Sequence, residues 1–407
     1  MSNPQNSEPK KTALVAVELA LSQILADVRP IEETEVLVLN DALGRILAAD
    51  FLAPLDVPPA DNSAMDGYCY CREDVPDEGA RLPISQRIPA GKAPQALKRG
   101  TAARIFTGAE MPAGADVVVM QEVCTLHGDS VEVPARAVGN DIRRRGQDVQ
   151  AGQVVIAKGA RLAAQHIGLL ASMGVARVAV LRRLKVAVLS TGDELVEPGQ
   201  PLHAGQIYNA NRYTLSALLQ QLNVDVIDLG IVPDRLDATE IALREAAEKA
   251  DCILSSGGVS VGEEDHVKTA IERLGDLTLW KLAIKPGKPF AYGHVLNTPF
   301  LALPGNPAAA FVTFLILCRP WLQKAQGGLD HAPIEVRLAA DFSHEKAAPR
   351  QEYLRARAEL RDGQWWAVPF HNQSSGILFS ACWGNGLAVV PLNETIAHGQ
   401  LVRFISY

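Results

Sequence analysis

One short stretch of the chain sets phosphate-binding groups directly before acids. In ILSSGGVSVGEEDH, residues 253–266, glycines and hydroxyl side chains precede two glutamates and an aspartate. Glycines at a helix start free backbone N–H groups, which bind phosphate. Carboxylates repel an oxyanion unless a cation bridges them, and Mg²⁺ is typically held by one or two carboxylates plus phosphate oxygens. We therefore interpret the stretch as a cradle for a magnesium-bridged phosphate. Its candidate phosphate-binding residues are Ser255, Ser256, Gly257, Gly258, Ser260 and Gly262.

Two further polar loops follow apolar runs that are typical of strands. STGDEL (190–195) follows KVAVL, and PGNP (304–307) follows PFLAL and opens a helical run. Taken singly, PGNP is most often a turn with proline at the first helical position, and TGDE is an ordinary turn. The carboxyl ends of parallel strands share one edge, where ligands of doubly wound sheets bind. The three loops together therefore predict a binding site at that edge, with Pro304, Gly305 and Asn306 among its residues.

Acids and lysines close to these loops complete the predicted site. Each acid either binds Mg²⁺ directly or lies just behind a ligand, and the candidates are Glu194, Asp234 and Asp265. The two glutamates of the cradle are interpreted instead as a solvated first helical turn, which the helix dipole favours. The run KLAIKPGKP is too broken by glycine and proline to be a charged helix face. Its lysines are candidates for the remaining anionic charge, and they are Lys281, Lys285 and Lys288.

Two more charged clusters lie in the first 150 residues. PPADNSAMDGY carries Asp61 and Asp66 in a segment with neither helical nor strand periodicity. IRRRGQD (142–148) places three arginines before a glycine and an acid. Such a cluster is either a solvated basic patch or a bidentate grip on phosphate. The sequence leaves both readings open.

The elements that position the three loops lie within residues 183–325. Apolar runs such as KVAVLS (185–190) and VDVIDLGIV (224–232) alternate with helical periods. One helix is predicted to begin at Asn211 as its cap, and the next at a capping box of Asp237 with Glu240. Strands that are apolar along their whole length and alternate with helices indicate a mostly parallel sheet covered on both faces.

The regions on either side of this domain show other sequence patterns. A helix with Thr12 as its cap is predicted near the N-terminus, and residues 51–153 alternate short apolar runs with Gly/Pro punctuation, which is typical of a compact β-rich module. Residues 333–407 are all β in pattern, with a hairpin turn at 361–364. We expect a multidomain α/β plus β protein with a central doubly wound α/β domain, a β-rich module, a helical linker region and a C-terminal β-barrel.

Composition sets the broad class. The chain has 407 residues and 48% hydrophobic residues, so two to four well-filled domains are expected. A net charge of −7 disfavours nucleic acid or an anionic membrane as partner. The six cysteines are scattered and form no metal-binding pair, which is typical of a reduced cytoplasmic protein. The N-terminus lacks the apolar core of a signal peptide, and AAAFVTFLILC (308–318) is too short to span a bilayer.

Taken together, the motifs resemble the molybdopterin molybdenumtransferase family, which includes MoeA proteins and the gephyrin E domain. The matching segments run in family order over nearly the whole chain. They are DNSAMDGY, FTGAEMP, VVMQE, IRRRGQD, STGDEL, GQIYNANR, SSGGVSVGEEDH, KLAIKPGKPF and LPGNP. The resemblance implies a homodimer of four-part protomers. The implied parts are a helical linker region (1–50 and 154–182), a β-rich module (51–153), a molybdopterin-binding α/β domain (183–330) and a β-barrel (331–407).

The resemblance also implies where the active site lies. It is formed between the α/β domain of one protomer and the β module of the other. Asp66, Thr107 and Asp148 would then face Glu194, Asp234, Asp265, Lys281 and Lys285. Arg355 in EYLRA and Ser375 in NQSSG match barrel positions that handle molybdate. One departure is that PGNP is followed by Ala308 and Ala309, where the family often has a hydroxyl residue.

The implied reaction is the Mg²⁺-dependent insertion of molybdate into adenylylated molybdopterin, which gives molybdenum cofactor and AMP. The absence of a Ser/His/Asp or Cys/His constellation agrees with this reaction, because it needs no covalent nucleophile. Handover contacts with molybdopterin adenylyltransferase and with molybdoenzymes are also implied. Two alternatives remain, a non-catalytic dimeric scaffold that binds molybdopterin and the preceding adenylylation step.

Overall fold

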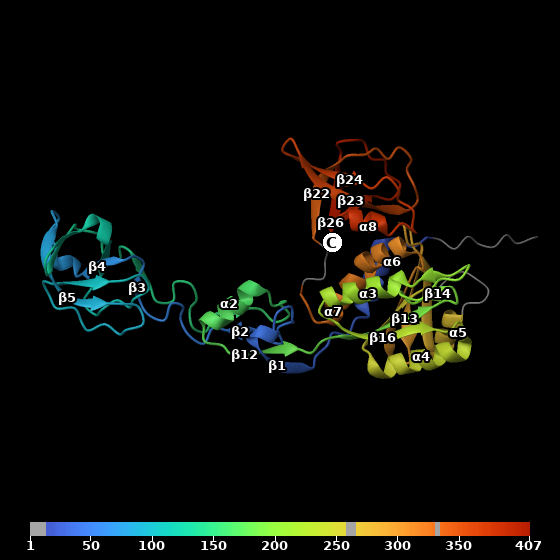
Figure 1. The fold of residues 1–407 in the computed structure, drawn as a ribbon, viewed down its shortest axis with the longest axis horizontal. Helices are drawn as coiled ribbons and strands as arrows, with labels where there is room; N and C mark the ends of the chain where they lie inside the picture. Colours follow the sequence, from blue (N-terminus) through green and yellow to red (C-terminus); the bar gives the residue numbers. More distant parts are fainter. Residues whose placement is uncertain (1–13, 258–265, 330–333) are drawn as a thin grey trace, which may run out of the picture.

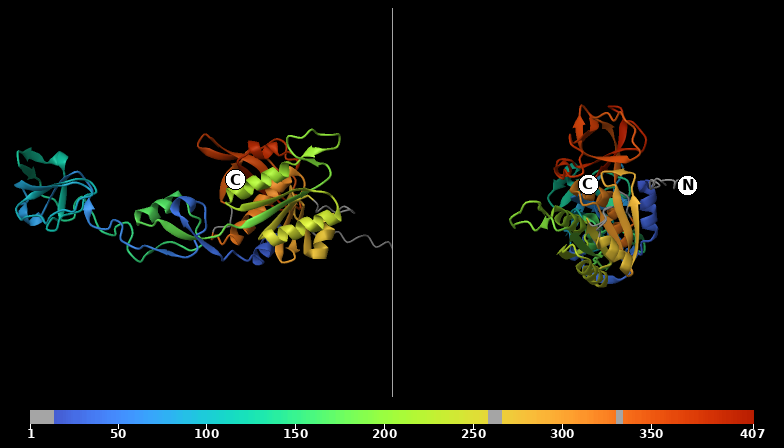
Figure 2. Two further views of the ribbon diagram at one scale, coloured as in Figure 1. Left: turned by 60° about the horizontal axis from the view of Figure 1, so that its bottom comes forward. Right: turned by 90° about the vertical axis from the view of Figure 1, so that its right-hand side faces the viewer.

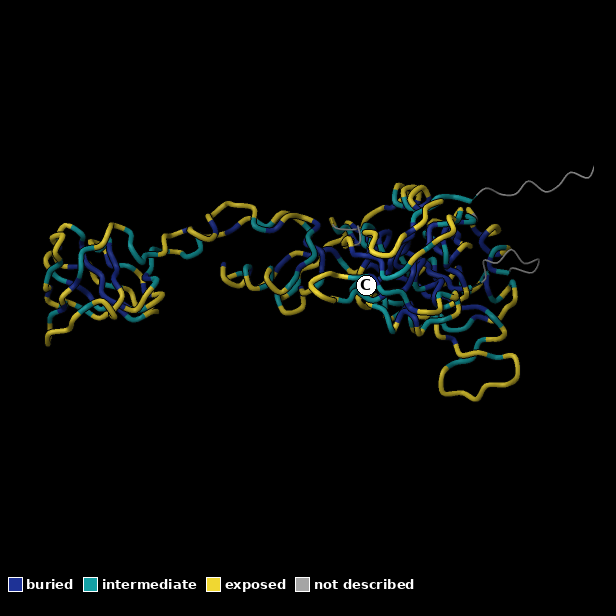
Figure 3. Tube along the Cα trace, turned by 90° about the horizontal axis from the view of Figure 1, so that it is seen from above, coloured by how far each residue is buried: buried dark blue, intermediate teal, exposed yellow. Residues whose placement is uncertain are grey.

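The computed structural model describes residues 14–257, 266–329 and 334–407. The molecule is elongated, with a β module at one end, a small middle region, and an α/β unit beside a β-barrel at the other end (Figure 1). Each part encloses buried residues of its own (Figure 3). In the described part of the chain, no helix is long and apolar enough to cross a membrane.

The α/β unit is built on a six-stranded sheet with the order β16-β13-β17-β21-β20-β18. The first four strands are parallel, and β20 and β18 continue the sheet antiparallel. In β13, Val186 and Val188 enter one core, while Ala187 and Leu189 enter a second core on the opposite face. The predicted doubly wound, mostly parallel sheet is therefore confirmed. The strands are β13 (Lys185–Thr191), β16 (Asp225–Val232), β17 (Cys252–Ser256), β18 (Gly275–Lys281), β20 (Pro289–Val295) and β21 (Thr298–Leu303).

Helices cover both faces of this sheet. α1, α3, α6 and α7 contribute to the core on one face, and α4 and α5 to the core on the other. The apolar run 308–318 is buried, because α6 continues through a π-helical turn (Phe314–Cys318) into α7. The helices are α1 (Val17–Ala26), α3 (Ala210–Gln221), α4 (Leu236–Lys249), α5 (His266–Leu274), α6 (Pro307–Thr313) and α7 (Arg319–Ala325).

Two helix starts differ from the sequence prediction, and the predicted cap Thr12 lies outside the described residues. The cap of α3 is Asn209, whose side chain accepts a hydrogen bond from the Arg212 backbone N–H. The predicted cap, Asn211, lies inside the first turn, so that prediction is wrong. The chain holds two asparagines two residues apart, and the one that reaches the third helical N–H is the cap.

The predicted capping box of α4 is also wrong. No side chain caps this helix, which begins after Arg235. The carboxylate of Asp237 forms an ion pair with Arg235, and Glu240 pairs with Arg273 of α5. The two acids therefore pair with arginines, and neither of them caps the start of the helix.

The C-terminal residues form the predicted barrel. Its sheet closes because β23 pairs with both β24 and β25. The predicted hairpin turn is confirmed, since Arg361 pairs with Gln364 and both intervening residues have positive φ. A short strand of the α/β unit, β19 (Ile284–Lys285), adds to β23 in parallel and joins the two parts. The barrel elements are β22 (Glu335–Ala340), β23 (Gln351–Arg361), β24 (Gln364–Pro369), α8 (Phe379–Trp383), β25 (Gly386–Val390) and β26 (Leu401–Ser406).

The β module is a six-stranded sheet with the order β7-β4-β6-β5-β9-β8 and cores on both faces. In the middle region, α2 packs over β1 and β12, which come from two separated segments. Two antiparallel stretches, paired as β2–β11 and β3–β10, carry the module away from this region (Figure 2). The elements are β1 (Thr34–Val38), β2 (Phe51–Leu52), β3 (Asn62–Ser63), β4 (Gly67–Tyr70), β5 (Ala80–Ile88), β6 (Ala102–Ile105), β7 (Val117–Met120), β8 (Thr125–His127), β9 (Ser130–Val133), β10 (Ile142–Arg143), β11 (Val154–Ile156), α2 (Ala164–Ser172) and β12 (Arg177–Leu181).

Candidate active site

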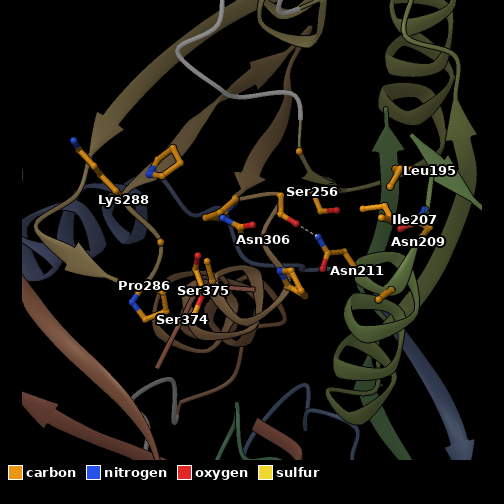
Figure 4. A pocket seen from close by; sticks show the side chains of 18 of the residues that line it. Leu195, Ile207, Asn209, Asn211, Ser256, Pro286, Lys288, Asn306, Ser374 and Ser375 are labelled. Atoms are coloured by element: carbon orange, nitrogen blue, oxygen red, sulfur yellow. Dashed lines mark hydrogen bonds between the residues drawn. The ribbon is translucent and has the colours of Figure 1, made fainter. Parts of the chain in front are cut away.

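A pocket of about 760 Å³ opens at the carboxyl edge of the α/β sheet, where the barrel meets it (Figure 4). Described residues of all three polar loops line it. Thr191 ends β13 and Glu194 lies in the loop after it, Ser256 and Gly257 come from the end of β17, and 304–307 from the loop after β21. Parallel strands bring these loops to one edge, which is where such sheets bind ligands.

The two ends of the pocket differ in chemistry. Lys288, Ser374 and Ser375 lie toward one end, and Leu195 and Ile207 lie toward the other (Figure 4). Lys285 and Arg350 add positive charge to the lining. The apolar end is formed by the short pairing of β14 (Leu195–Val196) with β15 (Ile207–Tyr208). One pocket thus offers cations and hydroxyls for an oxyanion together with an apolar wall for a ring.

Glu194 is held beside a glycine whose backbone only glycine adopts easily. Gly192 has φ +143°, and a side chain there would collide with the Glu194 carboxylate. The carboxylate therefore folds back over the loop at the pocket wall. Asp234 follows β16, is exposed and does not line the pocket, while Asp265 lies outside the described residues.

The described part of the Ser/Gly cradle ends at Gly257. Ser256 is 4% exposed and lines the pocket, whereas Ser255 is fully buried and does not. Gly257 has φ +86°, and its N–H donates to the Leu303 carbonyl at 3.1 Å, which ties the cradle to the neighbouring strand. Gly258, Ser260 and Gly262 lie outside the described residues.

The PGNP loop docks the barrel. Pro304, Gly305 and Asn306 line the pocket, and Pro307 begins α6 as expected. The first free backbone N–H groups of α6, those of Ala308 and Ala309, donate to the Ser375 carbonyl at 3.0 and 3.3 Å. The helix start therefore satisfies a barrel carbonyl, and Ala309 brings no hydroxyl to the pocket.

The three lysines of KLAIKPGKP separate in the structure. Lys285 and Lys288 line the pocket. Lys288 is exposed, whereas the Lys285 ammonium is 3.0 Å from a carboxylate oxygen of Glu352 in β23. Lys281 ends β18 and does not line the pocket.

The barrel arginines divide in a way that the sequence does not reveal. Arg355 is fully buried inside the barrel region, where it donates to the Ser380 hydroxyl at 2.9 Å and the Ser374 carbonyl at 3.0 Å. Burial lowers the pKa of Arg355 to about 10. Arg350 lines the pocket and forms no hydrogen bond or ion pair with any residue that the structure describes. Arg355 thus supports the 373–375 loop from behind, and Arg350 faces the cavity.

Other lining residues also escaped the sequence reading. Asn209 caps α3, and Asn211 donates to the Gly305 carbonyl at 2.7 Å, which fixes the PGNP loop against α3. Gln373 and Ser374 join Ser375 on the barrel side. The segment GQIYNANR carried the available signal, because two asparagines at the start of a helix that follows an edge loop are placed to reach a ligand.

Asp66, Thr107 and Asp148 lie far from this pocket within one protomer. Asp66 and Thr107 flank β4 and β6 of the β module, at the opposite end of the molecule from α3 and α6 (Figure 1). Asp66 accepts hydrogen bonds from the Thr107 backbone N–H and hydroxyl, both at 2.7 Å, and these bonds lower its pKa. Asp148 is exposed on the connection to the module. Asp66 and Thr107 therefore form a hydrogen-bonded pair, and none of the three residues lines the protomer's own pocket.

Two arginines of the cluster in IRRRGQD (142–148) form ion pairs. Arg144 pairs with Asp61, and Arg145 pairs with Asp56 across the double connection. The backbone N–H of Arg145 also donates to Asp61, and this bond leads the causes that lower the pKa of that carboxyl. These ion pairs brace the two antiparallel stretches. Both side chains are exposed, so the solvated reading agrees with the structure, which adds that each arginine is also paired with an aspartate.

The comparisons with known proteins cover most of the chain. Residues 15–174 match the profile of the MoeA N-terminal region (domain I and II), residues 187–324 a probable molybdopterin binding domain, and residues 335–407 the MoeA C-terminal region (domain IV). A molybdopterin molybdenumtransferase of Haemophilus influenzae is 43% identical over 348 residues, which are 84% of this chain and 85% of that protein. The chain belongs to the MoeA family.

Further relatives of this MoeA family member agree. A molybdopterin molybdenumtransferase of a Nostoc species is 39% identical over 380 residues, covering 89% of this chain and 86% of that protein. The crystal structure of a molybdopterin biosynthesis MoeA protein from Pyrococcus horikoshii superposes with a TM-score of 0.85 at 28% identity, over 97% of this chain and all of that one. The predicted family and fold class are therefore confirmed.

Proposed function

We propose that this MoeA family protein inserts molybdate into adenylylated molybdopterin and releases AMP. The observation that carries the proposal is the pocket between the α/β unit and the barrel, whose lining combines a phosphate cradle with cations and hydroxyls. Relatives that match most of the chain carry the name molybdopterin molybdenumtransferase. In the reaction, water attacks the phosphoanhydride and AMP leaves, while two Mo–S bonds form to the dithiolene and one molybdate oxygen departs as water with the two thiol protons.

The pocket residues divide these tasks by their chemistry. Ser256 and Gly257 lie where the diphosphate would meet a hydroxyl and a turn of backbone. Lys285, Lys288 and Arg350 supply positive charge for the tetrahedral molybdate dianion, and charged donors hold oxyanions more strongly than neutral ones. Ser374 and Ser375 add hydroxyls from the barrel side. Arg350 takes the place in this assignment that the sequence alone gave to Arg355, because only Arg350 faces the cavity.

The donor set at the pocket fits Mg²⁺ bound with substrate. Among the described residues, no group of three or more His, Cys, Asp or Glu is arranged to hold a metal. Mg²⁺ does not require one, since it is usually bound by one or two carboxylates together with phosphate oxygens and water. Glu194 offers such a carboxylate, and Asp265 remains a proposed second ligand. The ion would draw negative charge from the breaking phosphoanhydride.

We further propose that the protein works as a homodimer. Asp66 and Thr107 lie at the other end of the protomer from the pocket, and Asp148 lies on the connection to the module, so they would reach an active site in a second copy of the chain. Handover contacts with molybdopterin adenylyltransferase and with molybdoenzymes belong to the same proposal. The position of the β module, at the end of the molecule away from α3 and α6, supports this arrangement (Figure 1).

The test is AMP release from adenylylated molybdopterin in the presence of molybdate and Mg²⁺. Release by the wild type and its loss in Glu194→Gln are the expected results. Incubation with ATP and molybdopterin separates the preceding step, because formation of an adenylylated product there would instead identify an adenylyltransferase. Tight molybdopterin binding without any nucleotide release would identify a scaffold.

A further inference from the structure

Lys285 does not face the pocket as a free cation. Its ammonium nitrogen is 3.0 and 3.1 Å from the two carboxylate oxygens of Glu352. The Lys285 side chain is 44% exposed on the pocket side, while the Glu352 side chain is only 7% exposed. The pair is therefore asymmetric, with its carboxylate enclosed in protein and its ammonium open to the cavity.

The enclosed carboxylate depends on this lysine. Among the described residues, Lys285 is the only one whose side chain pairs with Glu352. A buried charge is costly unless it is paired, and removing one partner leaves the other uncompensated. The backbone fixes the same contact, because Lys285 and Glu352 are register partners in the β19–β23 pairing that joins the α/β unit to the barrel.

We propose that Glu352 is the positioning residue that aims Lys285 at the oxyanion. An ammonium group has three N–H donors on a flexible stem, and both carboxylate oxygens of Glu352 lie within hydrogen-bond distance of it. Held in this way, the lysine keeps a donor for a ligand in the pocket and loses little further freedom on binding. This inference rests on the proposed function in one respect, namely that the pocket binds molybdate.

Arg350 offers the contrast within the same pocket. It lines the cavity from the barrel side without a partner in the described residues, so nothing but its own stem restricts it. A guanidinium is planar and grips an oxyanion with a fork of donors, whereas an ammonium is a compact point charge whose position decides its contacts. The pocket therefore pairs one self-orienting cation with one that Glu352 has to orient.

The experiment is direct titration of molybdate into the full-length protein, without molybdopterin, by calorimetry. Glu352→Gln keeps the size of the side chain but removes its negative charge and leaves one amide oxygen, in place of two carboxylate oxygens, to accept from the ammonium. We expect the dissociation constant for molybdate to rise about tenfold, which corresponds to weakening one charge-assisted hydrogen bond. Glu352→Asp, which keeps the charge on a shorter stem, is expected to recover part of this loss.

A double-mutant cycle with Lys285→Met separates positioning from a merely structural role. In the Lys285→Met background, Glu352→Gln should change molybdate binding less than twofold, because the residue it orients is gone. Glu335→Gln is the matched control, since Glu335 pairs with Arg403 on the same barrel but does not line the pocket. This control should bind molybdate like the wild type.

The results distinguish the two proposals. Unchanged or tighter molybdate binding in Glu352→Gln, an equal effect with and without Lys285, or no molybdate binding by the wild type would each overturn the positioning role. A lower melting temperature without a change in affinity would show that Glu352 only secures the barrel. If the wild type bound molybdate but released no AMP, and Glu352→Gln weakened molybdate binding only in the presence of Lys285, the proposed function would be refuted and the positioning role would stand.

Discussion

Replacing Arg350 and Arg355 one at a time tests which barrel arginine meets the oxyanion. In Arg350→Ala, the half-saturating molybdate concentration should rise about 10- to 100-fold, because a hydrogen bond from a charged group contributes about 1.5–3 kcal/mol and each 1.4 kcal/mol is tenfold. The stability of this variant should stay within about 0.5 kcal/mol of the wild type, since Arg350 has no partner to lose in the described structure.

Arg355→Met should behave in the opposite way. The guanidinium donates to Ser380 and to the Ser374 carbonyl, at 2.9 and 3.0 Å, and losing both bonds costs roughly 3 kcal/mol or more. Burial lowers the pKa of Arg355 to about 10, so enclosing its charge already costs stability below that pH, and methionine removes this cost. A net loss of roughly 1–3 kcal/mol remains, with a modest effect on molybdate through the 373–375 loop.

The assay combines AMP release over a range of molybdate concentrations with thermal unfolding of the same samples. A matched pair of results is required, a shift in half-saturation for Arg350→Ala and a shift in melting temperature for Arg355→Met. If Arg355→Met raised the half-saturating concentration tenfold at unchanged stability, while Arg350→Ala left it alone, the division between a cavity-facing and a supporting arginine would be wrong.

Two further predictions concern the acids. Gly192→Ala should reduce AMP release at least tenfold and raise the Mg²⁺ concentration needed for half-maximal activity, because the added methyl displaces the Glu194 carboxylate. Gly199→Ala is the control, because its φ of +94° is similarly unusual but no atom lies within 4 Å of the added carbon. Thr107→Val removes one of two hydrogen bonds that lower the pKa of Asp66 from its ordinary value of 3.8, so that pKa should rise and stay below 3.8. The stability that the ionised carboxylate contributes is present above pH 3.8 and disappears as the pH falls through the lowered pKa. In the variant this stability should disappear at a higher pH, and carboxyl NMR titration of Asp66 measures the shift. An unchanged Asp66 titration would contradict the hydrogen-bond assignment.

The sequence predicts the α/β part of the site well, because parallel topology alone determines that the loops after β13, β17 and β21 share an edge. It predicts the barrel side less well. Arg350 and Arg355 are five residues apart near one strand. Which of them faces the cavity depends on where β23 begins and on how β23 pairs with β19. No local period carries that information.

Long-range partners explain the other misreadings. Arg144 and Arg145 look free in the sequence because Asp61 and Asp56, their ion-pair partners, stand more than eighty residues earlier. The cap of α3 was misplaced for a local reason, since Asn209 and Asn211 are equally suited by type. In each case the residue kinds were informative, and their partners depended on contacts that the chain makes only after folding.

The slender double connection to the β module has a consequence for how activity depends on protein concentration. Within one protomer, the stretches paired as β2–β11 and β3–β10, with their bracing ion pairs, connect the module to the rest of the described chain. If a second copy has to receive Asp66 and Thr107, specific activity should decline on dilution and recover on concentration. Molybdate uptake by the pocket, which one chain completes alone, should not change along the same dilution series.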